Sequence, residues 1–371
     1  MDILKNLKLN KKLLRELNYG AIIIAICIVI FGCINIYSAT NKNSGNHYVK
    51  MQIAFMILGL ITVYFLLVFD YMLMKNYAVI IYWVGILLLI IGDVFGKVTN
   101  GANSWIRFHG VGIQPSEFAK IGMIIIIAKK LDDMEGKINE PKNLIELIFY
   151  AAVPMLLIVI QPDMGMTMVS FFIVLGIFFC IGLDSKVIIG GVTTLLLVIV
   201  GVWNSSIIKP YWKGRLTSFL SPEKDQIGYG LQLYQSKLAL GSGGILGRGF
   251  TKGIQFKFVP ENHTDFIFAV LGEEWGLLGA LFLLLLYGTL IYQLIKIAKN
   301  AKDIFGTVIC VGFISNLLFS IMQNIGMTVG LMPITGITLP FMSYGGSSLL
   351  TSFIALGLVL NVGMRKKKIN F

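Results

Sequence analysis

Charged residues are scarce in this chain. They make up 13% of its 371 residues, whereas 56% are hydrophobic, and an ordinary soluble domain carries about 25% charged residues. A soluble fold is therefore excluded. Apolar runs recur from Tyr19 to Val362 without an interruption long enough to hold an independent core, so we predict a single membrane domain over residues 1–371.

Cysteine and histidine are also rare, which limits the sites that the chain can build. The four cysteines lie inside apolar runs without paired or metal-type spacing, and the three histidines are scattered. We therefore expect no disulfide and no metal centre built from these residues. The net charge of +12 would suggest a nucleic-acid partner in a soluble protein. In a membrane protein, basic residues are first explained by how they are distributed between the two sides of the membrane. We therefore expect no nucleic-acid partner.

Ten segments are long and apolar enough to cross a membrane, which takes about 20 mostly apolar residues. The predicted spans are 19–38, 51–69, 75–92, 113–130, 144–161, 164–183, 187–203, 266–295, 304–325 and 338–362. The predicted fold class is all-α, a polytopic membrane protein with about ten transmembrane helices. The basic residues before the first span resemble the front of a signal peptide, but the apolar run is too long and has no clear cleavage site. The first span should therefore remain in the protein as a membrane anchor.

The distribution of lysine and arginine predicts the orientation, because cytoplasmic loops collect these residues. With the N-terminus inside, 18 of the 31 basic residues fall on the cytoplasmic side. This arrangement predicts a multi-pass protein of the cell (cytoplasmic) membrane whose tails, 1–18 and 364–371, are both cytoplasmic.

The exception is a large extracellular loop, residues 204–265, between the seventh and eighth spans. Its eight basic residues fit either incidental charge on a solvated loop or a docking surface for anionic headgroups of membrane lipid. Within it, Leu231, Tyr234 and Leu238 have helical spacing, which predicts a short amphipathic helix along the outer interface. The glycine-rich stretch 241–249 lacks the phosphate-loop pattern of nucleotide sites, so we expect a tight loop that approaches a headgroup.

Polar groups inside spans are functional candidates, because an ionisable side chain there costs at least about 2.5 to 3.5 kcal/mol. Glu117 and Lys120 share one helix face at i and i+3 and can form either a structural or a substrate-binding ion pair. Asp163 follows Gln161-Pro162 between two spans. For Asp163, capping of the next helix is favoured over catalysis.

Two further stretches concentrate polar residues near the outer ends of spans. Residues 260–275 hold His263 and four carboxylates, Glu261, Asp265, Glu273 and Glu274. Thr264 or Asp265 could cap the helix that follows, but capping hardly explains so many acidic groups. The stretch 333–348 contains two prolines and three glycines. It predicts broken backbone, with hydroxyls that either satisfy freed groups or line a substrate path.

Seven motifs in order resemble the shape, elongation, division and sporulation (SEDS) family over nearly the whole chain. Any one of them is weak, but the series is specific. The residues of these motifs resemble the rod-shape branch of the family more than the division branch. The motifs are Gly101-Ala102 with Trp105-Ile106, Ile113 to Glu117 with Lys120, Gln161-Pro162-Asp163, Arg215 with Phe219-Leu220, Gln235 to Gly244, Pro260 to Phe268, and Gly330 to Ser348.

This resemblance implies a peptidoglycan glycosyltransferase that polymerises lipid II, an undecaprenyl diphosphate carrying a disaccharide-peptide, for cell elongation and shape. The essential acidic residue of the family falls on Asp265, where a carboxylate can take a proton from the acceptor hydroxyl during an inverting transfer. The resemblance also implies a class B penicillin-binding protein and the elongation machinery as partners. A divalent cation (Mg or Mn) bridging the diphosphate is a further expectation, with no organic cofactor.

The basic side chains Lys120, Arg215, Lys237 and Arg248 are expected to hold the diphosphate and stabilise its growing charge. The remaining expected substrate-binding residues are Trp105, Glu117, Asp163, His263, Thr264, Ser343 and Ser347. Where relatives carry an arginine before the tryptophan, this chain has Asn103-Ser104, which weakens the expectation of a donor contact there.

Two other functions remain open at this point. A lipid II flippase would also use broken helices and buried charges, although the spans show no evident inverted repeat and the polar groups gather toward one face. A scaffold that only recruits a transpeptidase would leave the carboxylate cluster without a purpose.

Overall fold

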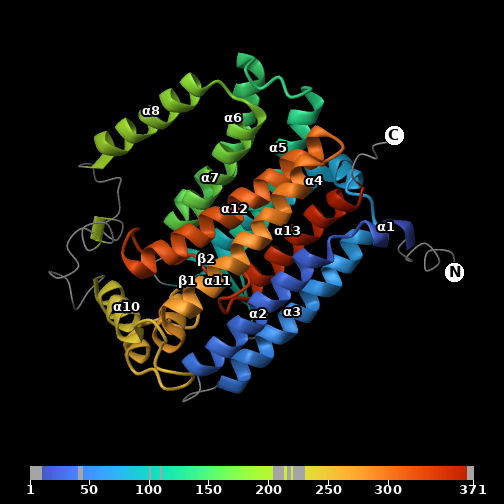
Figure 1. The fold of residues 1–371 in the computed structure, drawn as a ribbon. Helices are drawn as coiled ribbons and strands as arrows, with labels where there is room; N and C mark the ends of the chain where they lie inside the picture. Colours follow the sequence, from blue (N-terminus) through green and yellow to red (C-terminus); the bar gives the residue numbers. More distant parts are fainter. Residues whose placement is uncertain are drawn as a thin grey trace.

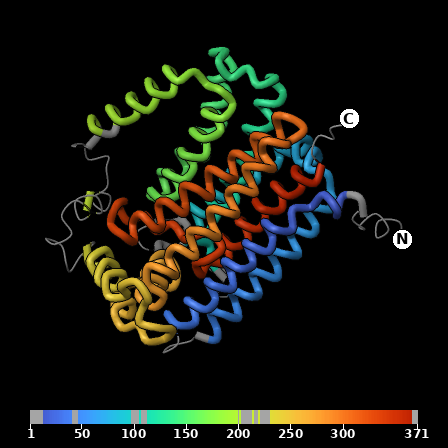
Figure 2. Tube along the Cα trace, in the orientation of Figure 1, coloured from blue at the N-terminus to red at the C-terminus, as the bar shows by residue number. Residues whose placement is uncertain are grey.

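The structure, a computed structural model, describes residues 11–40, 45–99, 102–108, 111–203, 213–214, 219 and 230–365. Long helices run side by side in a bundle, and α8 stands away from it (Figures 1 and 2). Each predicted span coincides with a helix, and a short helix α1 (Lys11–Arg15) precedes them. These helices are α2 (Tyr19–Thr40), α3 (Gly45–Val68), α4 (Met72–Phe95), α5 (Pro115–Asp133), α6 (Pro141–Ile160), α7 (Met164–Ile181), α8 (Ser185–Trp203), α11 (Ile267–Lys299), α12 (Ile304–Val329) and α13 (Gly346–Met364).

Within the described residues, eight of these helices are long and apolar enough to cross a membrane. The other two are α5 and α8. Helix α5 carries Glu117, Lys120 and a charged end, yet its middle is fully buried in the bundle. In α8, the apolar stretch is only Ser185–Val198. A membrane protein of many spans is confirmed, and the count of ten stays a prediction.

The predicted all-α fold class is confirmed, and a small antiparallel sheet lies between α4 and α5. Strands β1 (Lys97–Thr99), β2 (Ala102–Phe108) and β3 (Val111–Ile113) lie in that order. The stretch is rich in valine, threonine, isoleucine and aromatic residues, which favour strands, and it is too short to be read as a span. It carries Trp105 opposite Lys97.

The last span begins later than predicted. Helix α13 begins at Gly346 rather than near residue 338, and residues 331–345 contain no helix. Pro340 lacks an amide donor, and both Gly336 and Phe341 have positive φ, 75° and 64°. The hydroxyl of Ser343 accepts a hydrogen bond from the amide of Leu339 at 2.9 Å. The predicted broken backbone is confirmed, and it is longer than expected.

Helix α11 is interrupted at Gly276, where φ is 62° and ψ is −160°. The glycine-rich stretch 243–249 supplies the hydrogen bonds that the helix loses there. The amides of Arg248 and Gly249 donate to the carbonyls of Glu273 and Glu274 at 2.9 and 3.0 Å. In return, the carbonyls of residues 244 and 245 accept from the amides of residues 277 and 278 at 3.0 and 3.2 Å. The stretch is indeed a tight loop, but its backbone is packed against α11.

Replacing Gly247 should destabilise the protein, because a Cβ at this position would lie 2.2 Å from the carbonyl oxygen of Glu274. Gly244 is a matched control, since its φ is also positive, 57°, and a Cβ there meets nothing within 4 Å. Gly244→Ala therefore carries only the cost of positive φ, about 1–2 kcal/mol. We expect Gly247→Ala to lower the unfolding temperature in detergent clearly more than Gly244→Ala, and equal shifts would contradict this packing.

The predicted helix in the large loop is present as α10 (Gly230–Gly243). Its buried face is formed by Leu233, Ser236 and Ala239, which pack toward α11 and α12, where the hydroxyl of Ser236 donates to the carbonyl of Thr328 at 2.8 Å. Leu238, on the face that the sequence predicted as apolar, is exposed. The helix was predicted correctly, and its position along the membrane interface stays a prediction.

Candidate active site

Two non-helical segments meet at one end of the bundle, residues 261–266 before α11 and residues 331–345 before α13. The amide nitrogen of Asn324, on α12, donates to the carbonyl oxygens of Asp265 and Ile337, both at 2.7 Å. The Ser343 hydroxyl donates to the carbonyl of Thr264 at 2.5 Å. These bonds fix the backbone around Asp265 from two sides.

Asp265 directly precedes the N-cap position of α11. That position is held by Phe266, which makes no side-chain cap bond, rather than by Thr264 or Asp265 as the sequence suggested. The carboxylate is half-buried and faces the second segment, since a Cβ at Gly336 would stand 3.5 Å from its Oδ2. The acidic side chain therefore lies at the junction of the two broken stretches.

His263 and Thr264 belong to the same junction but are held differently. The His263 ring packs against Tyr48 and Tyr344, with ring centroids 4.9 and 5.8 Å apart. Burial lowers the pKa of His263, which keeps the ring neutral at pH 7. The Thr264 hydroxyl donates to the Glu261 carboxylate at 3.1 Å. His263 can therefore offer a neutral hydrogen-bonding group beside Asp265.

The two deeper glutamates hold the fold together, which corrects the expectation that capping could not explain them. The Glu273 carboxylate accepts three backbone amides, from residues 254, 255 and 256 at 2.7, 2.9 and 2.6 Å. It thereby caps the short 3₁₀ helix η2 (Gln255–Phe258). Glu274 accepts a hydrogen bond from the hydroxyl of Ser38 on α2. Both carboxylates are buried among these partners.

A second cluster of polar side chains links α5 to α13. Lys120 and Glu117 form an ion pair of 2.7 Å with side chains 7% and 6% exposed, and the Thr351 hydroxyl donates to Glu117 at 2.6 Å. One turn earlier, the Ser347 hydroxyl donates to the carbonyl of Gly112 at 3.0 Å. The start of α13 is thus fastened to β3 and to the first turn of α5.

Asp163 connects to this group through Gln114. Its carboxylate accepts from the Met166 amide at 3.0 Å, as an N-cap of α7, and from the Gln114 side chain at 3.2 Å. The capping role favoured by the sequence is confirmed.

Breaking the buried pair should be costly, because removing one partner leaves the other charge buried alone, at about 3–5 kcal/mol. We expect Glu117→Gln to lower stability strongly. The double change Glu117→Gln with Lys120→Met should recover much of the loss, since no charge is then left unpaired. The measurement is unfolding temperature in detergent for all three proteins, and a double variant less stable than Glu117→Gln would contradict the structural role.

The expected diphosphate-binding cations lie in different surroundings. Arg248 donates to the carbonyl of Ser242 at 3.2 Å and lies 3.7 Å from Glu273. Lys237 is exposed and lies against Gly330, where α12 ends, a position that favours a cation. Arg215 lies outside the described residues. Within the described part of the chain, no group of three or more metal-ligating side chains gathers.

Sequence reasoning missed Asn324 and its neighbour Gln323, which donates to the carbonyl of Pro333 at 2.8 Å. Both are fully buried on α12. The cost of burying charge points to ionisable side chains within spans, but a buried amide also requires a partner. Two adjacent amide side chains, Gln323 and Asn324, inside an apolar span were the sequence signal that could have identified them.

The fold and this site define a polytopic membrane protein with a carboxylate held between two broken helical segments at one end of the bundle. The chain belongs to the family of FtsW, RodA and SpoVE, described as cell cycle proteins, whose profile matches residues 17–368. This membership confirms the SEDS resemblance.

Individual relatives cover nearly the whole chain. It is 36% identical to stage V sporulation protein E of Bacillus subtilis, over 92% of this chain and 95% of the relative. It is 33% identical to the peptidoglycan glycosyltransferase MrdB of Escherichia coli, over 94% of each. A chain from a solved structure of a peptidoglycan synthase complex is similar with a TM-score of 0.82 and 31% identity, covering 94% of this chain and 97% of that one.

Proposed function

We propose that this protein is a peptidoglycan glycosyltransferase that polymerises lipid II, with Asp265 as the general base. The observation that carries the proposal is the placement of Asp265. Its carboxylate faces Gly336 across the junction of two non-helical segments, in a chain of a family with members named as this enzyme. Non-helical backbone at the end of a membrane bundle is suited to lining a substrate cavity.

The proposed reaction joins two sugars and releases a lipid diphosphate. The Asp265 carboxylate takes the proton from the 4-hydroxyl of the acceptor sugar as that oxygen attacks the anomeric carbon of the donor. The bond from that carbon to the diphosphate breaks, and the configuration inverts from α to β. The diphosphate carries away the electron pair and needs little acid assistance.

The growing charge on the diphosphate needs cations. Arg248 and Lys237 are the candidates among the described residues, and Arg215 is the candidate outside them. Lys120 is less suited, because it is buried with Glu117. A divalent cation remains a proposal. Because the described residues offer no protein-built metal cluster, such an ion would be held by one carboxylate and the substrate phosphates, as Mg²⁺ often is.

We further propose that this chemistry lies outside the cell. The end of the bundle opposite Asp265 contains the beginning of α2 and the ends of α11 and α13, and the basic residues concentrate at that end. We assign it to the cytoplasm. A class B penicillin-binding protein is the proposed partner, which agrees with the similarity to a chain of a peptidoglycan synthase complex, and the proposed setting is the cell-elongation machinery.

One assay separates the three functions considered. Purified protein in vesicles is supplied with fluorescent lipid II, with Mg²⁺, with Mn²⁺ or with a chelator. We expect glycan strands to form. Movement of lipid II across the bilayer without polymer would favour a flippase. Absence of both activities, whether or not the partner is present, would favour a scaffold.

A further inference from the structure

Three aromatic rings gather beside the junction that holds Asp265. The ring of Tyr48, in the first turn of α3, has its centroid 4.9 Å from that of His263 and 5.0 Å from that of Tyr344. The centroids of the His263 and Tyr344 rings are 5.8 Å apart. Each ring therefore lies against the other two, although the three residues come from α3, from the segment before α11 and from the segment before α13.

The backbone places these rings close to the proposed base. The Tyr344 amide donates to the carbonyl of His263 at 3.0 Å, and the hydroxyl of the preceding residue, Ser343, donates to the carbonyl of Thr264 at 2.5 Å. Two residues of chain span at most about 7 Å, so the Cα atoms of residues 263 and 265 are no further apart than that. A ligand that lies on the rings can therefore reach toward Asp265.

Tyr48 faces the junction rather than the surrounding lipid. Gln52 follows it by four residues, and side chains at this spacing share one face of a helix. The Gln52 side chain is fully buried and donates to the carbonyl of Ser343 at 3.0 Å. This face of α3 is therefore turned toward the segment before α13, which argues against Tyr48 as a member of a lipid-facing aromatic belt.

The three rings are only half-buried, unlike the tyrosines packed within the bundle. Tyr71 and Tyr287 are each 2% exposed, whereas Tyr48, His263 and Tyr344 keep part of their surface open. The open surface is also uncharged, because burial lowers the pKa of His263 and tyrosine ionises only near pH 10. An uncharged aromatic surface suits the face of a sugar better than it suits a diphosphate.

We propose that Tyr48, His263 and Tyr344 form an aromatic platform that binds one sugar of the lipid II disaccharide beside Asp265. The faces of aromatic rings carry partial negative charge, against which the C–H groups of a pyranose ring pack. The neutral imidazole of His263 adds one N–H donor and one nitrogen acceptor for sugar hydroxyls. The identity of the sugar rests on the proposed function.

The test is ligand-observed NMR of the full chain in lipid nanodiscs with chitotriose, a neutral and soluble oligosaccharide of N-acetylglucosamine. We expect the wild type to bind it saturably. Tyr48→Leu and Tyr344→Leu should each weaken binding by about two- to tenfold, as expected for the loss of one aromatic contact. Tyr48→Phe keeps the ring and should bind as the wild type does. In the polymerisation assay, the two leucine variants should raise KM by a similar factor with little change in kcat.

Tyr37→Leu is the matched control for the loss of a tyrosine ring. Tyr37 is a half-buried residue in the last turn of α2, and its ring stacks on Phe250 with centroids 6.3 Å apart. This variant loses a ring contact without changing the platform, so it should bind chitotriose as the wild type does. Equal weakening in Tyr37→Leu and the platform variants would overturn the proposal. Unchanged binding in both leucine variants of the platform, or no saturable binding by the wild type, would also overturn it.

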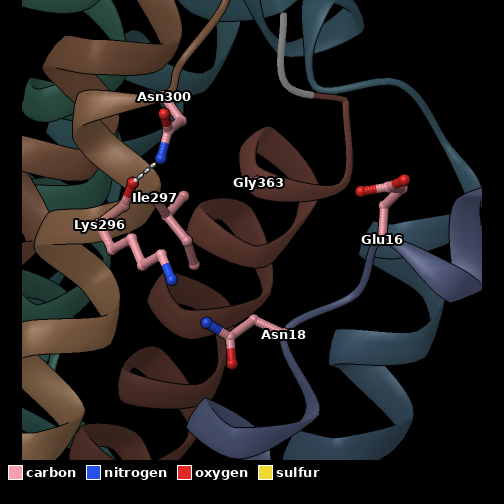
Figure 3. Close-up of a pocket in the computed structure, with 6 residues that line it drawn as sticks. All are labelled: Glu16, Asn18, Lys296, Ile297, Asn300 and Gly363. Atoms are coloured by element: carbon pink, nitrogen blue, oxygen red, sulfur yellow. Dashed lines mark hydrogen bonds between the residues drawn. The ribbon is translucent and has the colours of Figure 1, made fainter. Parts of the chain in front are cut away.

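A soluble sugar could also enter the pocket of about 220 Å³ at the opposite end of the bundle, where Asn18 and Lys296 present polar groups (Figure 3). Lys296→Gln should leave chitotriose binding unchanged. Loss of binding in this variant, with binding retained in the platform variants, would assign the sugar to that pocket and contradict the platform. The NMR measurement needs no reaction. A protein that binds chitotriose through the three rings but forms no glycan would therefore refute the proposed function and support the platform.

Discussion

Asp265→Asn is expected to reduce lipid II polymerisation by at least about 100-fold, because a positioned general base contributes roughly 10² to 10⁴ in rate. Asparagine keeps the size of the side chain but cannot accept the hydroxyl proton. The backbone bonds from Asn324 and Ser343 to this segment involve carbonyl oxygens, so the fold should persist. The measurement is the initial rate of glycan-strand formation, with unfolding temperature measured on the same samples.

Glu261→Gln is the control for Asp265→Asn. Glu261 is an exposed carboxylate in the same segment, bonded to the Thr264 hydroxyl at 3.1 Å. It should retain most of the activity, because its charge is not assigned to the reaction. An Asp265→Asn protein that polymerises as fast as Glu261→Gln would remove Asp265 from the chemistry.

Asn324→Leu is expected to lower kcat by about tenfold or more, with little change in KM. The leucine cannot donate to the carbonyls of Asp265 and Ile337, so the base loses its fixed position, and a misplacement of about 1 Å can cost 10²-fold in rate. Asn324 acts through Asp265 and is a positioning residue. The measurement is kcat and KM as a function of pH. The fall in kcat on the acidic side of this profile should also shift.

Gln323→Leu separates positioning from general destabilisation. Gln323 is the fully buried neighbour of Asn324, and it donates to the carbonyl of Pro333, in the segment without Asp265. Each change leaves buried carbonyls unsatisfied, at about 1–3 kcal/mol per group, so both variants should lose stability. Only Asn324→Leu should shift the pH profile. Equal losses of kcat in the two variants would indicate a purely structural role for Asn324.

The helices of the bundle were predictable because length and apolarity alone decide whether a segment can cross a membrane. Each predicted span contains a helix, and the boundary error is largest at α13. There the sequence indicated a break, through Pro340 and the neighbouring glycines, but not where the helix resumes. That position depends on the bonds of Ser343 and Ser347 to distant segments, which local pattern does not encode.

The candidate site was only partly predictable. The resemblance and the cost of burying charge pointed to Asp265 and to the pair of Glu117 and Lys120. The resemblance singled out Asp265, but the cost of burying charge alone could not separate Glu273 from it, because the difference lies in three backbone amides that fold back onto Glu273. Asn324 was missed because its importance comes from two carbonyls that only the folded chain brings together.

The interruption of α11 at Gly276 makes the beginning of this helix mechanically dependent on residues 243–249. The first turns of α11, which follow Asp265 directly, join the membrane-embedded remainder through bonds that residues 243–249 complete. A subunit that pulls on residues 243–249 would loosen that joint and tilt the Asp265 side chain. Such a coupling would let a bound partner change the position of the proposed base while the opposite ends of the helices stay still.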